Sequence, residues 1–176
     1  GLCSALRHWC ARYLGERGSS QWMLAPLLWL GARARQFAAE LDRAGSATTT
    51  SNQAKLVETL RELFQKLHRD RGKCDGALAM ACELLRLYFR LGQASQCSFL
   101  LAAINQSKAG QQLDPGSLPK ALAVSLYFYW GKHSVLEGNV VDAEEKLGWA
   151  LAHCPPRHRA HRGKILTYLI PCRLRP

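Results

Sequence analysis

The sequence lacks several patterns that would point to common enzymes or to disulfide-rich proteins. It has no glycine-rich loop of the GxGxxG or GxxxxGK[ST] type, so the usual dinucleotide and nucleoside triphosphate sites are excluded. It has no Cys-x-x-Cys pair, and its seven cysteines are odd in number and widely scattered. That distribution argues against a disulfide framework, and it indicates buried thiols in a protein of a reducing compartment.

Long apolar runs are also absent. The segment "QWMLAPLLWLGARA" resembles the core of a targeting signal, but its apolar run over residues 22–32 is too short to span a bilayer. We interpret this segment as a buried helix, and we expect neither a membrane nor a small-molecule substrate as a partner.

Acidic residues are scarce, and their absence becomes complete after Glu145. The chain has 24 Lys and Arg against 13 Asp and Glu, a formal charge of +11. This excess favours an acidic partner such as nucleic acid or an acidic protein. The cations that follow Glu145 are Lys146, Arg157, Arg159, Arg162, Lys164, Arg173 and Arg175.

Helical periodicity dominates, because strand-favouring residues are sparse and no segment alternates like a strand. We therefore predict an all-α protein with polar loops over residues 44–52 and 105–117. Proline suits a first helical turn, so Pro26 leaves open a start a few residues later for the second helix. The predicted helices cover residues 2–15, 20–43, 52–70, 75–91, 93–105, 118–137, 139–153 and 158–170.

The clearest local pattern is a helical hairpin around Gly138. Gly138 suits a left-handed helix end, and Asn139 can cap the helix that follows. The helices before and after Gly138 together resemble a degenerate tetratricopeptide unit. A second and weaker helical hairpin of the same kind has its turn at Gly92. The residues expected to pack this hairpin are Gly131, Gly138, Ala143, Leu147, Ala150 and Pro155.

Two groups of residues could carry chemistry, and neither favours catalysis. In the first group, which contains histidines and one cysteine near residues 153–161, the arginines that lie between them would repel a metal cation. No second cysteine lies nearby to complete a metal site. We therefore expect no metal, no cofactor and no enzymatic activity. Glu144 and Glu145 are adjacent on a helix, so they point in different directions and form a solvated face. The first group comprises His153, Cys154, His158 and His161.

The aromatic run at residues 127–130, "YFYW", could stack bases. Four consecutive helical positions span the whole circumference, so at most two of these rings could share one face. We interpret the run as part of a buried helix.

A basic run lies at the start of the last predicted helix, where the helix dipole disfavours cations. It either keeps the surface soluble beside an apolar helix, or contacts phosphate or an acidic chain. Its charges precede the apolar residues 165, 166, 169 and 170, so reversing them should leave the fold intact. The candidate residues for nucleic-acid or acidic-partner binding are Arg157, Arg159, Arg162, Lys164, Arg173 and Arg175.

The order of several blocks resembles the PCI-domain proteins of the nuclear mRNA-export (TREX-two) complex. A signalosome-associated PCI paralogue family shares the pattern. The resemblance covers roughly residues 20–176, and the blocks that carry it are "WMLAPL", "ARARQFAAELD", "CELLRLYFRLGQASQCSFLLAAI", "YFYWGKHSVLEGNVVDAEEKLGWALAHC" and "KILTYLIP".

This resemblance implies a right-handed superhelix of helical hairpins followed by a winged helix. It also implies a non-enzymatic scaffold at the nuclear pore that couples transcription to mRNA export. The implied partners are a Sac-type scaffold protein, the small acidic Sem/Dss protein, and RNA or DNA bound within the complex. The implied location is the nucleus, with the cytoplasm left open.

Other assignments remain open from sequence. The chain could be a PCI subunit of the signalosome, the proteasome lid or an initiation-factor complex, or a generic tetratricopeptide-type peptide binder. The sequence departs from the family by ending just after "ILTYLIP". We therefore expect residues 1–176 to form the helical-repeat part of a PCI protein, truncated before the winged helix, with an apolar face exposed on the last helix.

Overall fold

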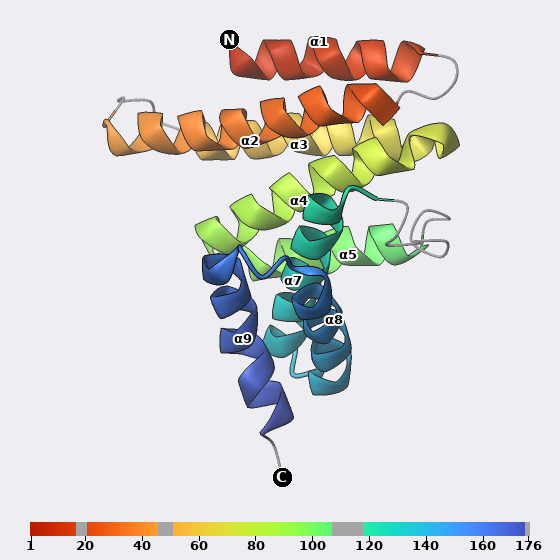
Figure 1. Ribbon diagram of the computed structural model, residues 1–176. Coiled ribbons are helices and arrows are strands. Elements are labelled where there is room, and N and C mark those ends of the chain that lie inside the picture. The colour runs from red at the N-terminus through yellow and green to blue at the C-terminus, as the bar shows by residue number, and fades with distance from the viewer. Residues whose placement is uncertain (17–20, 46–50, 107–117, 175–176) are drawn as a thin grey trace. The chain divides into compact units, whose positions relative to one another are not determined.

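The computed structural model describes residues 1–16, 21–45, 51–106 and 118–174 (Figure 1). These residues form α-helices and one short 3-10 helix, and no strand occurs among them. The prediction of an all-α protein is therefore confirmed, and each predicted helix agrees with an observed one to within three residues at either end.

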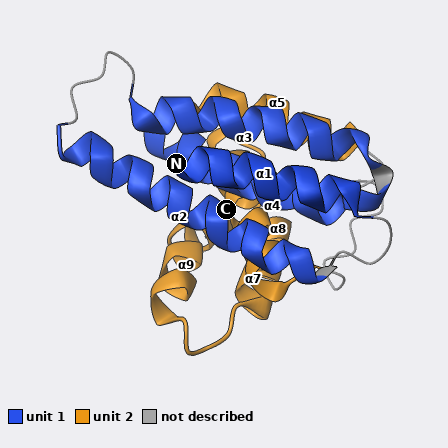
Figure 2. Ribbon diagram, turned by 90° about the horizontal axis from the view of Figure 1, so that it is seen from above, with its two compact units in different colours: residues 1–92 blue, residues 93–176 orange. Residues whose placement is uncertain are grey.

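The chain divides into two compact units, residues 1–92 and 93–176 (Figure 2). Each is described by itself, so the predicted superhelix and the single repeat region over residues 1–176 stay predictions. The first unit contains α1 (Leu2–Gly15), α2 (Gln21–Arg43), α3 (Asn52–Arg69), η1 (Arg71–Lys73) and α4 (Cys74–Leu91). The second contains α5 (Ala94–Gln106), α7 (Lys120–Leu136), α8 (Val140–His153) and α9 (Arg159–Arg173).

The first unit is built around α4, whose side chains are buried along most of its length. One face of α3 carries leucines that pack against α4, and α2 contacts both of these helices. Where α4 begins, Gly76 leaves room for the ring of Tyr13 from α1. Lys73 lies over the same ring and donates from Nζ to the carbonyl oxygen of Glu16 at 3.0 Å, which ties the end of α1 to the start of α4.

The end of α2 is fastened to the start of α3 by the carboxylate of Asp42. Its Oδ1 accepts from the backbone N–H of Asn52 at 2.7 Å, and its Oδ2 accepts from that of Gln53 at 3.2 Å. Hydrogen bonds from the side chains of Ser51 and Gln53, with those backbone groups, hold the pKa of Asp42 well below its usual range. The carboxylate thereby satisfies N–H groups that a helix start leaves without partners.

Because of these hydrogen bonds to Asp42, the free energy of unfolding should decrease at acidic pH. Because the folded state lowers the pKa of Asp42, its contribution is present above the unfolded pKa of about 3.9 and is lost as pH falls toward the folded value. We expect Asp42→Asn to lower the melting temperature at pH 7, and the difference from the parent protein to shrink below about pH 4. Thermal melts followed by circular dichroism across this range test it. A difference that stays constant down to pH 3 would contradict the assignment.

Two prolines lie inside helices rather than at their boundaries. The second helix begins at Gln21 and includes Pro26, so the predicted start at residue 20 is confirmed to within one residue and the later start left open at Pro26 is not observed. The last helix continues through Pro171 to Arg173, and the backbone N–H of Leu174 still donates to the carbonyl oxygen of Ile170 at 3.0 Å. A proline removes one helical hydrogen bond, and in the last turn that loss does not stop the residues that follow.

The second unit is organised by the hairpin of α7 and α8, with α9 packed against both (Figure 1). Gly138 turns the chain in the left-handed region with φ of 76°, and the side chain of Asn139 accepts from the N–H of Asp142 at 3.2 Å. Gly131 of α7 lies against Leu147 of α8, and Pro155 is half-buried in the turn after α8. One buried cluster of this unit consists of Ala143, Leu147, Ala150, Cys154, Ile165, Leu169 and Cys172.

Candidate nucleic-acid interface

An exposed group of cations lies in the turn between α8 and α9 and in the first two turns of α9. Arg157, Arg159 and Lys164 are all exposed, and none forms an ion pair or hydrogen bond with a residue that the structure describes. His158 and His161 lie among them, also exposed, with ring centroids 6.0 Å apart. We call these five residues the α8–α9 basic surface.

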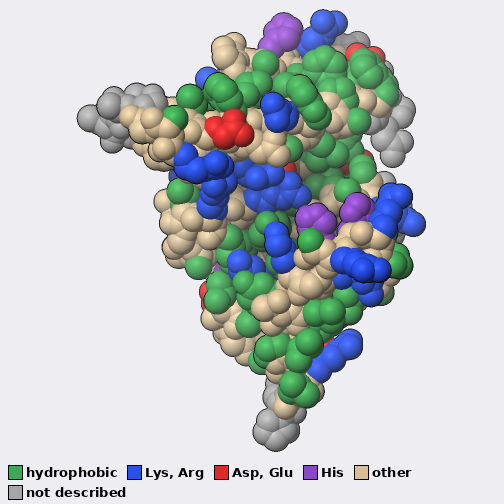
Figure 3. Space-filling model, turned by 60° about the vertical axis from the view of Figure 1, so that its left-hand side comes forward, with side chains coloured by type: hydrophobic (Ala, Val, Ile, Leu, Met, Phe, Trp, Pro, Cys, Tyr) green, Lys and Arg blue, Asp and Glu red, His purple; other side chains and the backbone are tan. Residues whose placement is uncertain are grey.

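The helix start adds to the positive potential of this surface. No side chain caps α9, because its N-cap residue His158 makes no hydrogen bond to the first turn. The first-turn N–H groups and the helix dipole therefore favour an anion, and no acidic residue follows Glu145 to offset them. Figure 3 shows the side of the molecule on which histidines and Lys and Arg side chains lie together with few acidic ones.

Arg162 belongs to the fold rather than to this surface. Its Nη1 donates to the carbonyl oxygens of Leu151 at 2.9 Å and Cys154 at 2.8 Å. These are carbonyls at the C-terminal end of α8, where a helix leaves acceptors without partners. The expectation that the whole basic run can be reversed without harm to the fold is therefore wrong at Arg162, since glutamate there would face two carbonyl oxygens.

The remaining two candidates do not join the turn. Arg173 lies at the other end of α9, about 20 Å along the helix, and its Nε pairs with Oε1 of Glu144 at 3.1 Å. Arg175 lies outside the described residues. The predicted set of six therefore divides into three exposed cations in the turn and at the start of α9, one helix cap, one ion pair and one undescribed residue.

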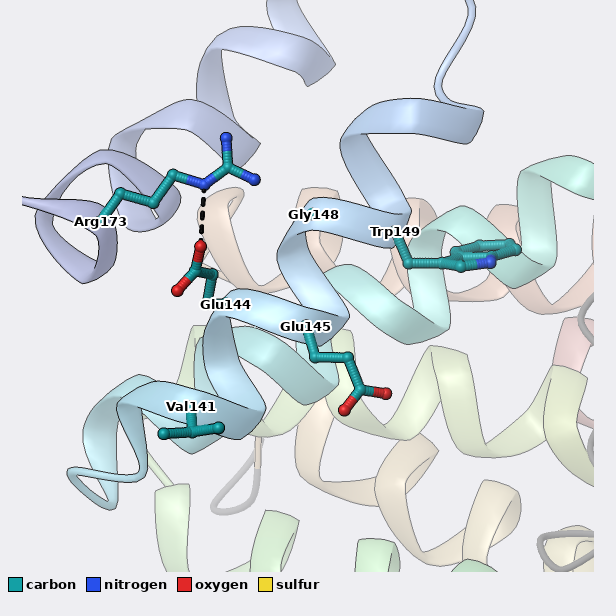
Figure 4. A pocket seen from close by; sticks show the side chains of 6 residues that line it. All are labelled: Val141, Glu144, Glu145, Gly148, Trp149 and Arg173. Atoms are coloured by element: carbon teal, nitrogen blue, oxygen red, sulfur yellow. Dashed lines mark hydrogen bonds and ion pairs between the residues drawn. The ribbon is translucent and has the colours of Figure 1, made fainter.

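A surface hollow of about 400 Å³ lies beside Arg173 (Figure 4). Two glutamates approach it from α8, and one of them already bonds the arginine. The other carboxylate, on Glu145, accepts from Lys146 at 3.0 Å. Charges of both signs thus neutralise one another at the rim, so the hollow does not favour a phosphate. Its lining residues are Val141, Glu144, Glu145, Gly148, Trp149 and Arg173.

The histidine and cysteine group does not assemble into a reactive site. His153 stacks on Trp149 and bonds the backbone of its own helix, whereas the neighbouring Cys154 is buried. Among the described residues, no group of three or more His, Cys, Asp and Glu is placed to hold a metal ion. Elsewhere, burial raises the pKa of Cys10 and of Cys97 to about 11, so these thiols stay protonated at neutral pH.

One polar cluster was not foreseen from the sequence. The Nε2 atom of buried His133 lies 3.2 Å from Oγ of Ser98 and 3.8 Å from Oε1 of Glu137. A hydrolytic triad needs the nucleophile and the orienting carboxylate on opposite ring nitrogens. Here both partners share Nε2, and Nδ1 is buried without a hydrogen bond. The cluster therefore links α5 to α7 and does not form a triad. Only the i, i+4 spacing of His133 and Glu137 was visible in the sequence.

The aromatic run at residues 127–130, interpreted from sequence as part of a buried helix, is half-buried at every position. Tyr127 packs on Trp149 with ring centroids 4.3 Å apart, and Phe128 meets Tyr168 edge-on at 6.0 Å. The rings point around the helix, and they hold α8 and α9 to α7. In the described ranges, no helix is both long enough and apolar enough to cross a membrane.

The chain is similar to several curated proteins, some of which are named as PCI domain-containing proteins. It is 30% identical over 115 residues to Enhanced ethylene response protein 5 of Arabidopsis thaliana, covering 65% of the chain and 27% of that protein. It is 27% identical over 99 residues to PCI domain-containing protein 2 of Xenopus laevis, covering 56% and 24%. It is 29% identical over 191 residues to the Protein CSN12 homolog of Gibberella zeae, covering 93% and 42%.

These matches confirm the resemblance, so the chain is a helical protein similar to PCI-domain proteins. Its similarity is to the paralogue group that includes PCI domain-containing protein 2 and the CSN12 homologs. The chain spans between about a quarter and two fifths of the length of these three relatives. No family model matches the chain. No solved structure matches it either.

Proposed function

We propose that the protein is a non-enzymatic scaffold subunit of a PCI-containing complex that couples transcription to mRNA export at the nuclear pore. Its location would be nuclear, and its partners would be a Sac-type scaffold protein and the small acidic Sem/Dss protein. The support is the similarity to PCI domain-containing protein 2 together with an all-helical fold of hairpins. Co-purification of the tagged protein from nuclear extract, with the partners identified by mass spectrometry, tests this assignment.

A second assembly is favoured by a different observation. The match to a CSN12 homolog covers 93% of the chain at 29% identity, whereas the match to a PCI domain-containing protein 2 homolog covers 92% at 24% identity. A scaffold role in a signalosome-associated complex is therefore the alternative. Signalosome subunits recovered in the same co-purification, in place of a Sac-type scaffold, would select it.

Within either complex, we propose that the α8–α9 basic surface binds the phosphates of nucleic acid. The observation that carries this proposal is the group of exposed cations Arg157, Arg159 and Lys164, which no described acidic residue neutralises. Phosphate contacts release condensed counterions, so affinity through this surface falls steeply with salt.

The test is a triple charge reversal that spares the helix cap at Arg162. We expect Arg157→Glu, Arg159→Glu and Lys164→Glu together to weaken binding of a fluorescent single strand at least tenfold at low salt. The slope of log affinity against log salt should fall by about 0.7 for each phosphate that the variant no longer neutralises. Fluorescence anisotropy at several salt concentrations measures both quantities.

The matched control reverses three exposed cations of α3, Lys55, Lys66 and Arg69, and removes the same formal charge from the chain. We expect this control to lower affinity far less, because a local surface and not net charge is responsible. Equal losses in the two triple variants would mean that only the overall charge matters, and the assigned surface would be wrong.

A further inference from the structure

The last residue of α8 presents an ordered ring to solvent. The imidazole of His153 stacks on the indole of Trp149, with centroids 3.9 Å apart and planes inclined by 17°. Trp149 in turn packs on Tyr127 with centroids 4.3 Å apart. One face of the imidazole is therefore covered by the indole, and because His153 is exposed, the other face is open.

This ring is held in place before any ligand arrives. Nδ1 of His153 lies 2.9 Å from the carbonyl oxygen of Trp149, and because a carbonyl only accepts, Nδ1 carries the hydrogen. Stacking on one side and this hydrogen bond at the edge fix the orientation of the side chain. A ligand that stacks on the open face thus does not have to order a freely rotating side chain, which lowers the entropic cost of binding.

The open ring lies four residues before Arg157, the first of the proposed phosphate-binding cations. His153 ends α8 immediately before the turn that carries Arg157 and leads into α9. The guanidinium of Arg162 fastens the start of α9 to the last carbonyls of α8, so the turn is fixed with respect to the ring. A stacking face and a cationic surface in this arrangement are the two components of sites that hold single-stranded nucleic acid.

We propose that the open face of His153 stacks an unpaired base of single-stranded nucleic acid whose phosphates contact the α8–α9 basic surface. The inference rests on the nucleic-acid binding proposed above and adds the class of strand. A duplex keeps its bases stacked inside the helix, so it has no unpaired base that could stack on the ring of His153. The site therefore selects single strands over duplexes.

The first test is His153→Ala in the 176-residue chain, with binding measured by fluorescence anisotropy. A stacked base is worth enough that its loss should weaken binding of twelve-residue oligo-uridine RNA or oligo-thymidine DNA about five- to tenfold. Affinity for a duplex of equal length should not change. Parallel RNA and DNA arms show whether the site accepts both sugars.

A strand without bases separates stacking from charge. An abasic DNA twelve-mer has the phosphates but no base, so the parent protein and His153→Ala should bind it equally. His153→Phe keeps a ring on Trp149 and should restore most of the affinity for oligo-thymidine. The matched control is His68→Ala, because His68 stacks on Phe64 one turn earlier in α3, with centroids 5.1 Å apart and planes at 25°, in the unit that does not contain α8 and α9. It should change no affinity.

The outcomes distinguish base stacking on His153 from the phosphate binding on which it rests. If the triple charge reversal weakens binding but His153→Ala does not, the stacking site is wrong and the phosphate surface stands. Equal losses of duplex and single-strand binding in His153→Ala, or no recovery in His153→Phe, would also overturn the stacking site. If neither triple reversal nor His153→Ala changes binding of any strand, the nucleic-acid surface itself is wrong.

Discussion

Replacing Leu169 by aspartate is expected to unfold the core of the second unit. The side chain of Leu169 is 1% exposed and packs in the cluster formed by α8 and α9. The variant loses the burial of a leucine and places a carboxylate among the apolar side chains of this cluster. Together these effects should lower the free energy of unfolding by about 4 kcal/mol. Urea unfolding followed by circular dichroism and tryptophan fluorescence measures the change.

The neighbouring residue supplies the control for this prediction. Ile170 is 49% exposed, so Ile170→Asp adds the same charge at the next position while leaving it in water. Its effect should stay within about 1 kcal/mol, as for other surface substitutions. Comparable destabilisation by the two variants would show that α9 does not pack with Leu169 inward, and the assigned core of the second unit would be wrong.

The same contrast shows what helical periodicity could and could not predict. Spacing placed Ile165, Leu166, Leu169 and Ile170 together as packing residues, but only the first and third are fully buried. Periodicity fixes the direction of the apolar face, whereas its width depends on how closely α8 approaches. The sequence likewise predicted all the described α-helices, since caps such as Asn139 and turns such as Gly138 are local signals.

The interactions missed from sequence join residues through backbone groups or across turns. Asp42 was not singled out, because its partners are N–H groups that become neighbours only after α2 and α3 have folded. Arg162 was counted as a surface cation for a similar reason: its two acceptors are carbonyl oxygens, which no sequence pattern marks. A basic run gives the number of charges, but only the structure shows which cations already have partners.

For the stacking site, the sequence drew attention to the residues involved but not to how they are arranged. In the sequence, His153 drew attention as a metal ligand or catalytic base, and base stacking was sought in the aromatic run at residues 127–130. In the structure the two features meet, because Tyr127 packs on Trp149 and Trp149 on His153. The i, i+4 spacing of Trp149 and His153 was a visible signal of helical stacking. Their proximity to the turn cations depends on how α9 folds back along α8.

Replacing Gly131 by alanine is expected to separate α7 from α8. An added Cβ would lie 2.7 Å from Cγ and 3.2 Å from the backbone nitrogen of Leu147. The leucine side chain could rotate away, but the backbone of α8 cannot move without opening the whole hairpin. Overpacking of this kind costs about 1 to 3 kcal/mol, and here the upper part of that range applies because backbone is involved. Urea unfolding of the variant and the parent measures the difference.

Gly148 is the matched control, because it is also a glycine inside a helix of the same hairpin. A Cβ there would meet only Nη2 of Arg173 at 3.6 Å, an ordinary contact with the end of a flexible side chain. Alanine favours helices over glycine by about 0.5 to 1 kcal/mol, so Gly148→Ala should leave stability unchanged or raise it. Opposite signs for the two variants would identify close approach of α7 and α8, rather than helix propensity, as the requirement at position 131. Stabilisation by both would mean that the two helices lie farther apart than the contact with Leu147 requires.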